Sequence, residues 1–220
     1  MSRVVLFGTG AVARVVHFLL AHDSPHEVVA FAVDRDHWQG GEMEGHPIVA
    51  FEDLPALYPP GDFAMFIAVG YRRMNRFRAE RYERAKAMGY ELITHVSPRA
   101  STWPGLEVGD NCLVMDQVVV QPFVRVGNNV ILWSGSHIGH DSVVGDHCFV
   151  SSHAIVSGYV TVGDNCFLGS NATIRDGITI ARECVIGAGA VVTRDTTERG
   201  VYAAPQAILL PMTSDRLPNL

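Results

Sequence analysis

The sequence predicts a small α/β domain over residues 1–95, a parallel β-helix over residues 96–197, and a closing loop and tail over residues 198–220. Two observations carry this prediction. In the second half, an aliphatic residue recurs at every sixth position, which fits neither the period of a helix nor that of a simple strand. In the first half, short apolar runs alternate with helix-like segments, as in a parallel sheet with helices packed on it.

The first 95 residues follow a strand–turn–helix order. We expect strands over residues 4–7, 28–33, 63–69 and 91–95, and helices over residues 12–20 and about 73–88. The turn Gly8-Thr9-Gly10 can present backbone N–H groups and a helix N-terminus to a phosphate, as in a Rossmann-like domain. Asp34 falls where an acid that binds a ribose would stand. An ordinary tight turn and a strand-end aspartate are the alternative, and the residues alone leave both open.

The second predicted helix and the residues just before it are strongly basic. Seven of the 17 basic residues of the chain lie here: Arg72, Arg73, Arg76, Arg78, Arg81, Arg84 and Lys86. A solvated helix face explains the cluster most simply. Alternatively, Arg72 and Arg73, at the end of the third strand, contact a diphosphate.

The second half repeats every six residues. From Val96 to Val192 each sixth residue is Val, Ile or Leu, with Thr102 as the exception, and a small or β-branched residue follows four places later from Val108 onward. A short strand plus a corner explains such a unit. Three units form a triangular coil of 18 residues, and successive coils stack with parallel pairing at roughly 4.8 Å. The aliphatic residues then fill the interior of a prism.

The cysteines follow the same repeat. Cys112, Cys148, Cys166 and Cys184 are separated by multiples of six, which matches no zinc or redox spacing. We therefore expect small core residues at one corner of the prism. His147 stands at that corner in line with Asn129 and Asn165, so we interpret it as a turn residue.

The repeat gives His140 and its neighbour Asp141 a distinctive position in the prism. His140 is the third residue of its six-residue unit, so its side chain should point outward between the stacked positions Pro122 and Gly158. A histidine beside a glycine leaves a notch on the surface. An imidazole can act as a general base near neutral pH, and an adjacent carboxylate can fix its tautomer.

Composition excludes several functions. The net charge of −6 argues against general nucleic-acid binding. No apolar run is long enough to insert into a membrane, and the N-terminus lacks the features of a secretion signal. We therefore expect a cytoplasmic protein.

The plan of a Rossmann-like domain joined to hexapeptide repeats, with the stretch Ser136-His137-Ile138-Gly139-His140-Asp141-Ser142-Val143-Val144-Gly145, resembles a known family. These are the sugar acyltransferases of the sialic-acid O-acetyltransferase and bacillosamine-pathway N-acetyltransferase type, and GDP-perosamine N-acetyltransferases share the plan. The resemblance implies a left-handed β-helix, a homotrimer with active sites between subunits, acetyl-CoA as co-substrate, no metal, and His140 with Asp141 as the catalytic pair.

The same resemblance implies roles for further residues. The coenzyme should lie near Gly158, Ser170 and Ala188, with the Gly158 N–H as the oxyanion donor. A nucleotide-linked amino sugar should contact the small domain, for which we name Gly8, Gly10, Asp34 and Arg72. The segment Gly200–Pro205 matches the closing loop of the family, and we expect the final residues to pack back near the coenzyme.

These observations favour N-acetylation of a nucleotide-linked amino sugar, in the synthesis of a cell-surface glycan such as the O-antigen of lipopolysaccharide. O-acetylation of a sialic-acid-type sugar is the main alternative, because the base and the donor would be the same. A zinc enzyme of the γ-carbonic-anhydrase kind would need three convergent histidines, and His137, His140 and His153 do not align. A non-catalytic NAD-binding module would leave the long repeat unexplained.

Overall fold

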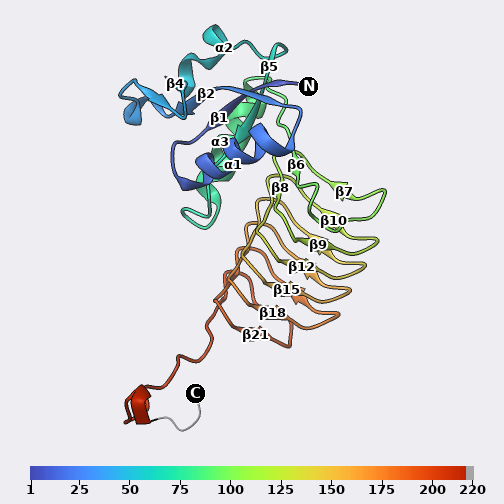
Figure 1. The fold of residues 1–220 in the computed structure, drawn as a ribbon. Coiled ribbons are helices and arrows are strands. Elements are labelled where there is room, and N and C mark those ends of the chain that lie inside the picture. Colours follow the sequence, from blue (N-terminus) through green and yellow to red (C-terminus); the bar gives the residue numbers. More distant parts are fainter. Residues whose placement is uncertain (217–220) are drawn as a thin grey trace.

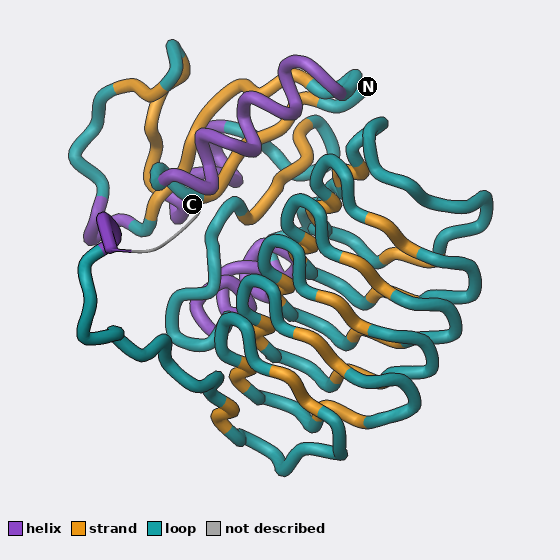
Figure 2. The backbone as a smooth tube through the Cα atoms, turned by 60° about the horizontal axis from the view of Figure 1, so that its bottom comes forward, coloured by secondary structure: helices purple, strands orange, loops and turns teal. Residues whose placement is uncertain are grey.

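The computed structural model describes residues 1–216, which form an α/β domain seated on a triangular β-prism (Figures 1 and 2). The prism is a left-handed parallel β-helix, as predicted. Among these residues, no helix combines the length and the apolar character that a bilayer crossing demands.

The α/β domain has a five-stranded sheet in the order β3-β4-β2-β1-β5. Its strands are β1 (Arg3–Phe7), β2 (Glu27–Val33), β3 (Glu42–Met43), β4 (His46–Ala50) and β5 (Phe63–Ile67). Its helices are α1 (Ala11–Asp23), α2 (Leu54–Leu57) and α3 (Arg76–Ala87), with short 3-10 turns at Arg35–His37 and Phe51–Asp53. Alternate residues of β1 face opposite ways, so α1 packs on one side of the sheet and α3 on the other.

Two predicted elements differ from the structure. The helix α3 begins at Arg76 instead of about residue 73, because Arg73, Met74 and Asn75 all have left-handed backbone angles. The strand expected over residues 91–95 is reduced to a single bridge at Leu92, and β6 (His95–Val96) already pairs with the prism. The antiparallel pair β3–β4 was not predicted, since β3 is only two residues long and has no apolar run.

The prism has three faces, each a parallel sheet. The covered face holds β6, β8 (Leu113–Val114), β11 (Ile131–Leu132), β14 (Phe149–Val150), β17 (Phe167–Leu168), β20 (Val185–Ile186) and β22 (Val201–Tyr202). The middle face holds β9 (Val119–Val120), β12 (His137–Ile138), β15 (Ile155–Val156), β18 (Thr173–Ile174) and β21 (Val191–Val192). The open face holds β7 (Glu107–Val108), β10 (Arg125–Val126), β13 (Val143–Val144), β16 (Thr161–Val162) and β19 (Thr179–Ile180).

The core of the prism confirms the six-residue pattern. The second residue of each strand points inward, and Val114, Leu132, Val150, Leu168 and Ile186 are fully buried. The four cysteines are buried and unpaired at one corner, as predicted for small core residues. Burial raises the pKa of the Cys112 thiol to about 12, so this thiol stays protonated and unreactive at neutral pH.

Three corners join the faces. The α3 corner, between the open and covered faces, comprises residues 109–112, 127–130, 145–148, 163–166 and 181–184. The histidine corner, between the middle and open faces, comprises residues 121–124, 139–142, 157–160 and 175–178. The third corner, between the covered and middle faces, comprises residues 115–118, 133–136, 151–154, 169–172 and 187–190.

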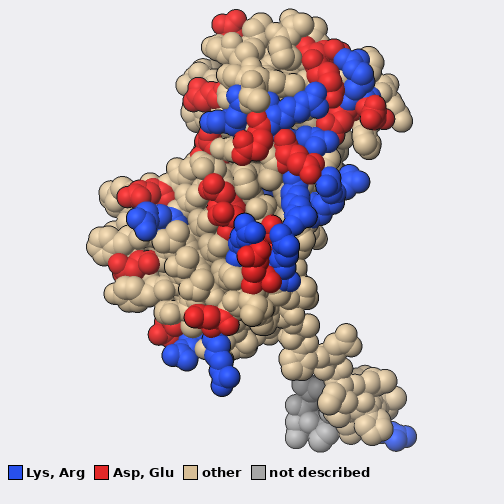
Figure 3. All heavy atoms as spheres, turned by 180° about the vertical axis from the view of Figure 1, so that it is seen from behind, with Lys and Arg blue, Asp and Glu red and all other residues tan. Residues whose placement is uncertain are grey.

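Helix α3 lies along the α3 corner. Lys86 at its C-terminal end pairs with Asp110 of an early coil, and Arg76 at its N-terminal end pairs with Glu183, about four coils further on. A 12-residue helix is about 18 Å long, comparable to four coil steps of roughly 4.8 Å. From behind, acidic and basic side chains alternate where the domain meets the prism (Figure 3). Part of the basic cluster is therefore a junction between domains: Arg76, Arg78 and Lys86 contact the prism. The others with a partner, Arg73, Arg81 and Arg84, pair with acids of the α/β domain.

The chain leaves the prism after β22. Ala204 still lies near the last coil, but Ile208 and Leu209 are 85% and 94% exposed, and the segment extends away from the prism to a 3-10 turn at Ser214–Arg216 (Figure 1). Within one chain the described part of the tail does not fold back on the prism. The rest of the predicted tail, residues 217–220, lies outside the described residues.

Candidate active site

His140 and Asp141 form a hydrogen-bonded pair at the histidine corner. Nδ1 of His140 lies 2.9 Å from Oδ2 of Asp141, and the imidazole is 48% exposed. Asp141 has a φ of 58°, a left-handed conformation that aspartate tolerates and that the corner requires. Because a carboxylate only accepts hydrogen bonds, we assign the proton of the neutral ring to Nδ1, which leaves a lone pair on Nε2.

Gly158 provides the predicted notch beside this ring. A Cβ added to Gly158 would lie 2.8 Å from both Cε1 and Nε2 of His140, so only glycine leaves room for the ring here. The ring of Tyr159 stands edge-on to the imidazole at 5.0 Å. The Gly158 N–H has no hydrogen-bond partner within residues 1–216, and it belongs to the residue whose α-carbon faces the His140 ring.

Gln121 is a site residue that the sequence interpretation missed. Its Oε1 accepts a hydrogen bond of 2.9 Å from the backbone N–H of His140. Gln121 precedes Pro122, the residue stacked on His140 from the previous coil, and this neighbourhood was the available signal. The bond ties His140 to the coil before it.

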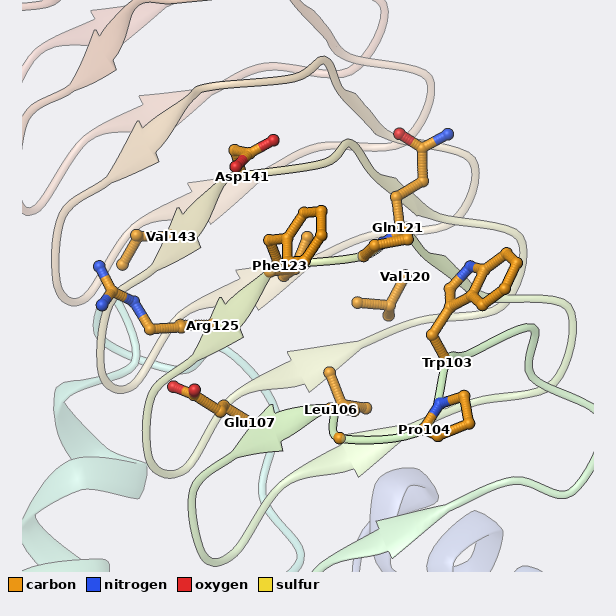
Figure 4. Close-up of a pocket in the computed structure, with 13 residues that line it drawn as sticks. Trp103, Pro104, Leu106, Glu107, Val120, Gln121, Phe123, Arg125, Asp141 and Val143 are labelled. Atoms are coloured by element: carbon orange, nitrogen blue, oxygen red, sulfur yellow. The ribbon is translucent and has the colours of Figure 1, made fainter.

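A cavity of about 550 Å³ opens next to Asp141 (Figure 4). Its lining includes Trp103, Leu106, Gln121, Phe123, Arg125 and Asp141. Phe123 is 81% exposed and Trp103 is 60% exposed. Asp141 therefore borders a space with both aromatic and charged walls that could hold part of a substrate or of another chain.

Ser170 and Ala188, predicted to contact the coenzyme, lie away from His140 in one chain. They stack on successive coils of the third corner, where the Gly189 N–H donates to the Ser170 carbonyl at 2.9 Å. Gly158 lies on the histidine corner, across the middle face. The structure thus places Gly158 next to His140 but does not bring all three predicted coenzyme residues together.

A second cavity, of about 360 Å³, lies in the α/β domain at the carboxyl ends of β1, β2 and β5. Gly8, Gly10, Asp34 and Arg72, the four residues predicted to bind the acceptor, all line it. Gly8 has a φ of 120°, and a Cβ there would lie 2.8 Å from the Ala68 carbonyl oxygen, so this turn requires glycine. We call this space the acceptor cavity.

Two charged residues of the acceptor cavity differ in their partners. The Asp34 carboxylate accepts hydrogen bonds from Arg81 at 2.9 and 2.7 Å, a partner that the sequence did not suggest. The Arg72 guanidinium lies over the Phe77 ring at 5.3 Å and has no acidic partner within the described residues. Arg73, its neighbour, is held by Glu80. Arg72 is thus the available cation for a diphosphate at this cavity.

The acceptor cavity and His140 lie on different sides of one chain. Tyr71, next to Arg72, packs on Phe149 and Phe167 of the covered face, with ring centroids 5.1 and 4.8 Å away. His140 stands on the histidine corner, the corner of a triangular prism that lies opposite the covered face. One chain therefore holds both parts of the predicted site without joining them.

The three histidines considered for zinc are separate. His137 lies on the middle face, His153 stacks over Gly135 at the third corner, and His140 is on the histidine corner. Within residues 1–216 no group of three His, Cys, Asp or Glu side chains could hold a metal ion. This arrangement does not support a γ-carbonic-anhydrase-like site.

Comparison with known proteins agrees with this geometry. Residues 105–140 and 126–158 match the bacterial transferase hexapeptide family (six repeats), and residues 159–194 match the hexapeptide repeat of succinyl-transferase. A His→Asn variant of perosamine N-acetyltransferase from Caulobacter crescentus, in complex with CoA and GDP-perosamine, superimposes with a TM-score of 0.83 at 28% identity, over 91% of this chain and 93% of that one. The chain is thus similar to hexapeptide-repeat sugar acetyltransferases in its repeats and in its overall fold.

A second solved structure shows the same likeness. The acetyltransferase domain of PglB from Neisseria gonorrhoeae FA1090 superimposes with a TM-score of 0.79 at 26% identity, over 91% of this chain and 96% of that domain. A structure of that domain with acetyl coenzyme A matches equally well. No curated protein matches the sequence at a significant level.

Proposed function

We propose that this chain transfers the acetyl group of acetyl-CoA to the amine of a nucleotide-linked sugar, with His140 as the general base. The observation that carries the proposal is the imidazole held by Asp141 over Gly158, a residue whose own N–H has no hydrogen-bond partner within residues 1–216. The relatives that bind CoA with GDP-perosamine, or acetyl coenzyme A, support the choice of substrates.

The reaction is a direct transfer. The amine nitrogen attacks the thioester carbonyl carbon, and Nε2 of His140 takes the proton that the nitrogen loses. The C–S bond of the tetrahedral intermediate then breaks, and the imidazolium returns its proton to the departing sulfur. No acyl-enzyme is required, because each of the four cysteines is buried in the prism.

Two groups stabilise the charges that develop. Asp141 holds the Nδ1–H and stabilises the imidazolium as it forms. The Gly158 N–H, which has no partner within the described residues, can donate to the oxyanion of the tetrahedral intermediate. A preorganised backbone donor of this kind needs no reorganisation during the reaction.

We further propose that the complete site forms between subunits of a homotrimer. The acceptor cavity of one chain lies by its covered face, and its own His140 is on the opposite corner. A neighbouring prism can bring its histidine corner to that covered face. Gly158 of one subunit would then face Ser170 and Ala188 of another, with the pantetheine arm of the coenzyme in the groove between them. By this proposal Gly8, Gly10, Asp34 and Arg72 bind the nucleotide sugar.

The proposed setting is the cytoplasm, in the synthesis of O-antigen or another lipopolysaccharide glycan. The test measures the release of free thiol from acetyl-CoA in the presence of each member of a panel of nucleotide-linked amino sugars, starting with GDP-perosamine. Each amino sugar is paired with its hydroxy analogue. We expect turnover with at least one amino sugar and no turnover with its hydroxy analogue. Turnover only with hydroxy sugars would replace N-acetylation by O-acetylation, and no turnover with any acceptor would reject the function.

A further inference from the structure

The segment that precedes α3 has an unusual backbone. Arg73, Met74 and Asn75 are three consecutive non-glycine residues with φ values of 54°, 55° and 62°. Left-handed backbone is unfavourable for residues with a Cβ, and such a run persists only where the surrounding structure holds it. The segment Gly70–Asn75, which we call the acceptor loop, must therefore be fixed by its neighbours.

Asn75 fixes one end of the acceptor loop to the prism. Its side chain is fully buried, and Nδ2 donates to the Cys166 carbonyl oxygen at 3.0 Å. Its Oδ1 accepts from Nη1 of Arg78 at 3.0 Å. An asparagine also adopts a left-handed φ more readily than most residues, so one residue supplies both the conformation and the contacts.

Arg78 fixes the other end. It is fully buried, and its guanidinium donates to carbonyl oxygens of Gly70 at 3.0 Å, His147 at 2.9 Å and Cys148 at 3.0 Å. It also contacts Asn129 through both the carbonyl and the side-chain oxygen. No carboxylate approaches it within residues 1–216. Burial lowers the pKa of Arg78 to about 10, which still leaves the guanidinium charged at neutral pH.

The acceptor loop forms one wall of the acceptor cavity. Gly70 and Arg72 line the cavity, and Tyr71 between them packs on Phe149 of the covered face. The guanidinium of Arg78 thus joins a wall of the cavity to the carbonyl groups of two coils. A buried cation without a counter-ion is costly to keep, so the bonds that it makes to this loop need an explanation.

We propose that Asn75 and Arg78 are positioning residues for the acceptor: they hold the acceptor loop in its left-handed form, so that Gly70 and Arg72 are preset to receive the nucleotide diphosphate. Neither residue lines the acceptor cavity, so both act through the loop. This inference rests on the proposed function of the cavity.

A purely structural role, the docking of α3 on the prism, predicts something different. Arg76 with Glu183 and Lys86 with Asp110 also join α3 to the prism, but among the described residues the side chains of these pairs make no hydrogen bond to the acceptor loop. Substitutions there should weaken docking without moving the cavity wall. Arg76→Gln and Lys86→Met are therefore matched controls.

The experiment compares Asn75→Gly and Arg78→Lys with these controls in the full-length protein. Asn75→Gly keeps the left-handed φ without strain and removes only the amide contacts. Arg78→Lys keeps the charge but cannot form the five-donor fork. For each variant we measure kcat, KM for the acceptor, KM for acetyl-CoA, and binding of GDP and UDP by calorimetry.

We expect Asn75→Gly and Arg78→Lys to raise KM for the acceptor and Kd for the bound nucleotide by about tenfold or more, and to leave KM for acetyl-CoA within about twofold. The controls should keep both constants near wild type. Equal changes in both KM values, or control variants that behave like Asn75→Gly, would overturn the inference. Failure of the proposed function is distinct, because the wild-type chain would then acetylate no acceptor. If Arg78→Lys fails to fold, the KM and Kd values of Asn75→Gly alone test the inference.

Discussion

The histidine corner and the α3 corner carry the same two residue types in opposite order. One reads Gly139-His140-Asp141-Ser142, and the next corner that the chain reaches on the way to the covered face reads Gly145-Asp146-His147-Cys148. Each six-residue unit is counted from its inward aliphatic residue, Ile138 or Val144. In both corners the fourth residue of the unit is left-handed, with φ values of 58° at Asp141 and 61° at His147. The backbone is the same, yet the two imidazoles have different surroundings.

The position in the unit decides what each histidine does. His140, at the third position, points outward, and its Nδ1 donates to a carboxylate. His147, at the fourth position, lies under Tyr82 of α3, and its Nδ1 is 2.8 Å from Nδ2 of Asn129, which can only donate. The two neutral rings therefore carry their protons on different nitrogens. By our proposal, a histidine of this prism acts as a base only where its unprotonated nitrogen is exposed.

The largest effect should come from His140→Ala. Removal of the general base should lower kcat by at least about 10²-fold and leave the free energy of unfolding nearly unchanged, because the ring is half exposed and outside the core. Thiol release with the best acceptor measures kcat, and thermal unfolding measures the stability. Turnover close to wild type would reject the assignment of His140 as base.

Gly158→Ala should have the next largest effect. The new methyl group would lie 2.8 Å from Nε2 and Cε1 of His140, so the ring must leave its position over the notch. We expect kcat to fall about 10- to 100-fold with a folded protein, since a small misplacement of a reacting group is costly. Asp176→Ala, at the same position one coil further on and exposed, is the matched control. Equal activity of the two variants would contradict the role of the notch.

A smaller effect is expected for Asp141→Asn. The amide keeps the size of the side chain but removes the charge that orients Nδ1–H and stabilises the imidazolium. The pair is partly exposed, with Asp141 at 37%, so water can replace some of this stabilisation, and we expect a loss in kcat of about tenfold. KM for acetyl-CoA should not change. A loss as large as that of His140→Ala would indicate that the tautomer is fixed by Asp141 alone.

The sequence was sufficient for the prism and the notch, because both depend on a strict repeat. A residue 18 positions away stacks on its partner, so Gly158 could be placed next to His140 by counting. The cysteines could be assigned to the core in the same way. Similarly, the strand–glycine–helix order was enough to bring Gly8, Gly10, Asp34 and Arg72 to one cavity.

The junction between the domains was not predictable in the same way. Helix α3 has arginine on several sides, and no apolar stripe shows which side will be buried. Arg78 is buried only because the α3 corner presents carbonyl oxygens of Asn129, His147 and Cys148, which are far away in sequence. The partner of Asp34 depends on the same docking. Contacts of this kind do not recur at a fixed spacing along the chain, so a single sequence does not reveal them.

The smallest effect concerns stability and not catalysis. Burial lowers the pKa of His147 below the ordinary 6.5, and its Nδ1 accepts from Asn129, so the folded chain holds this ring neutral. At pH values between the lowered pKa and 6.5, the unfolded chain binds more protons than the folded chain. The stability that the neutral His147 contributes is therefore complete above pH 6.5 and is lost as the pH falls through the folded pKa.

His147→Asn should therefore flatten the pH dependence of stability on the acid side. Asparagine suits the position, since Asn111, at the equivalent place two coils before residue 147, already donates to Oδ1 of Asn129 at 2.7 Å. We expect the variant to lose less of its free energy of unfolding than the wild type between about pH 7.5 and about pH 5.5, as measured by denaturant unfolding. Turnover at neutral pH should be retained, in contrast to His140→Ala. An unchanged pH dependence would show that His147 does not contribute, and that His17, His26 and His95, whose pKa values burial also lowers, account for the acid loss.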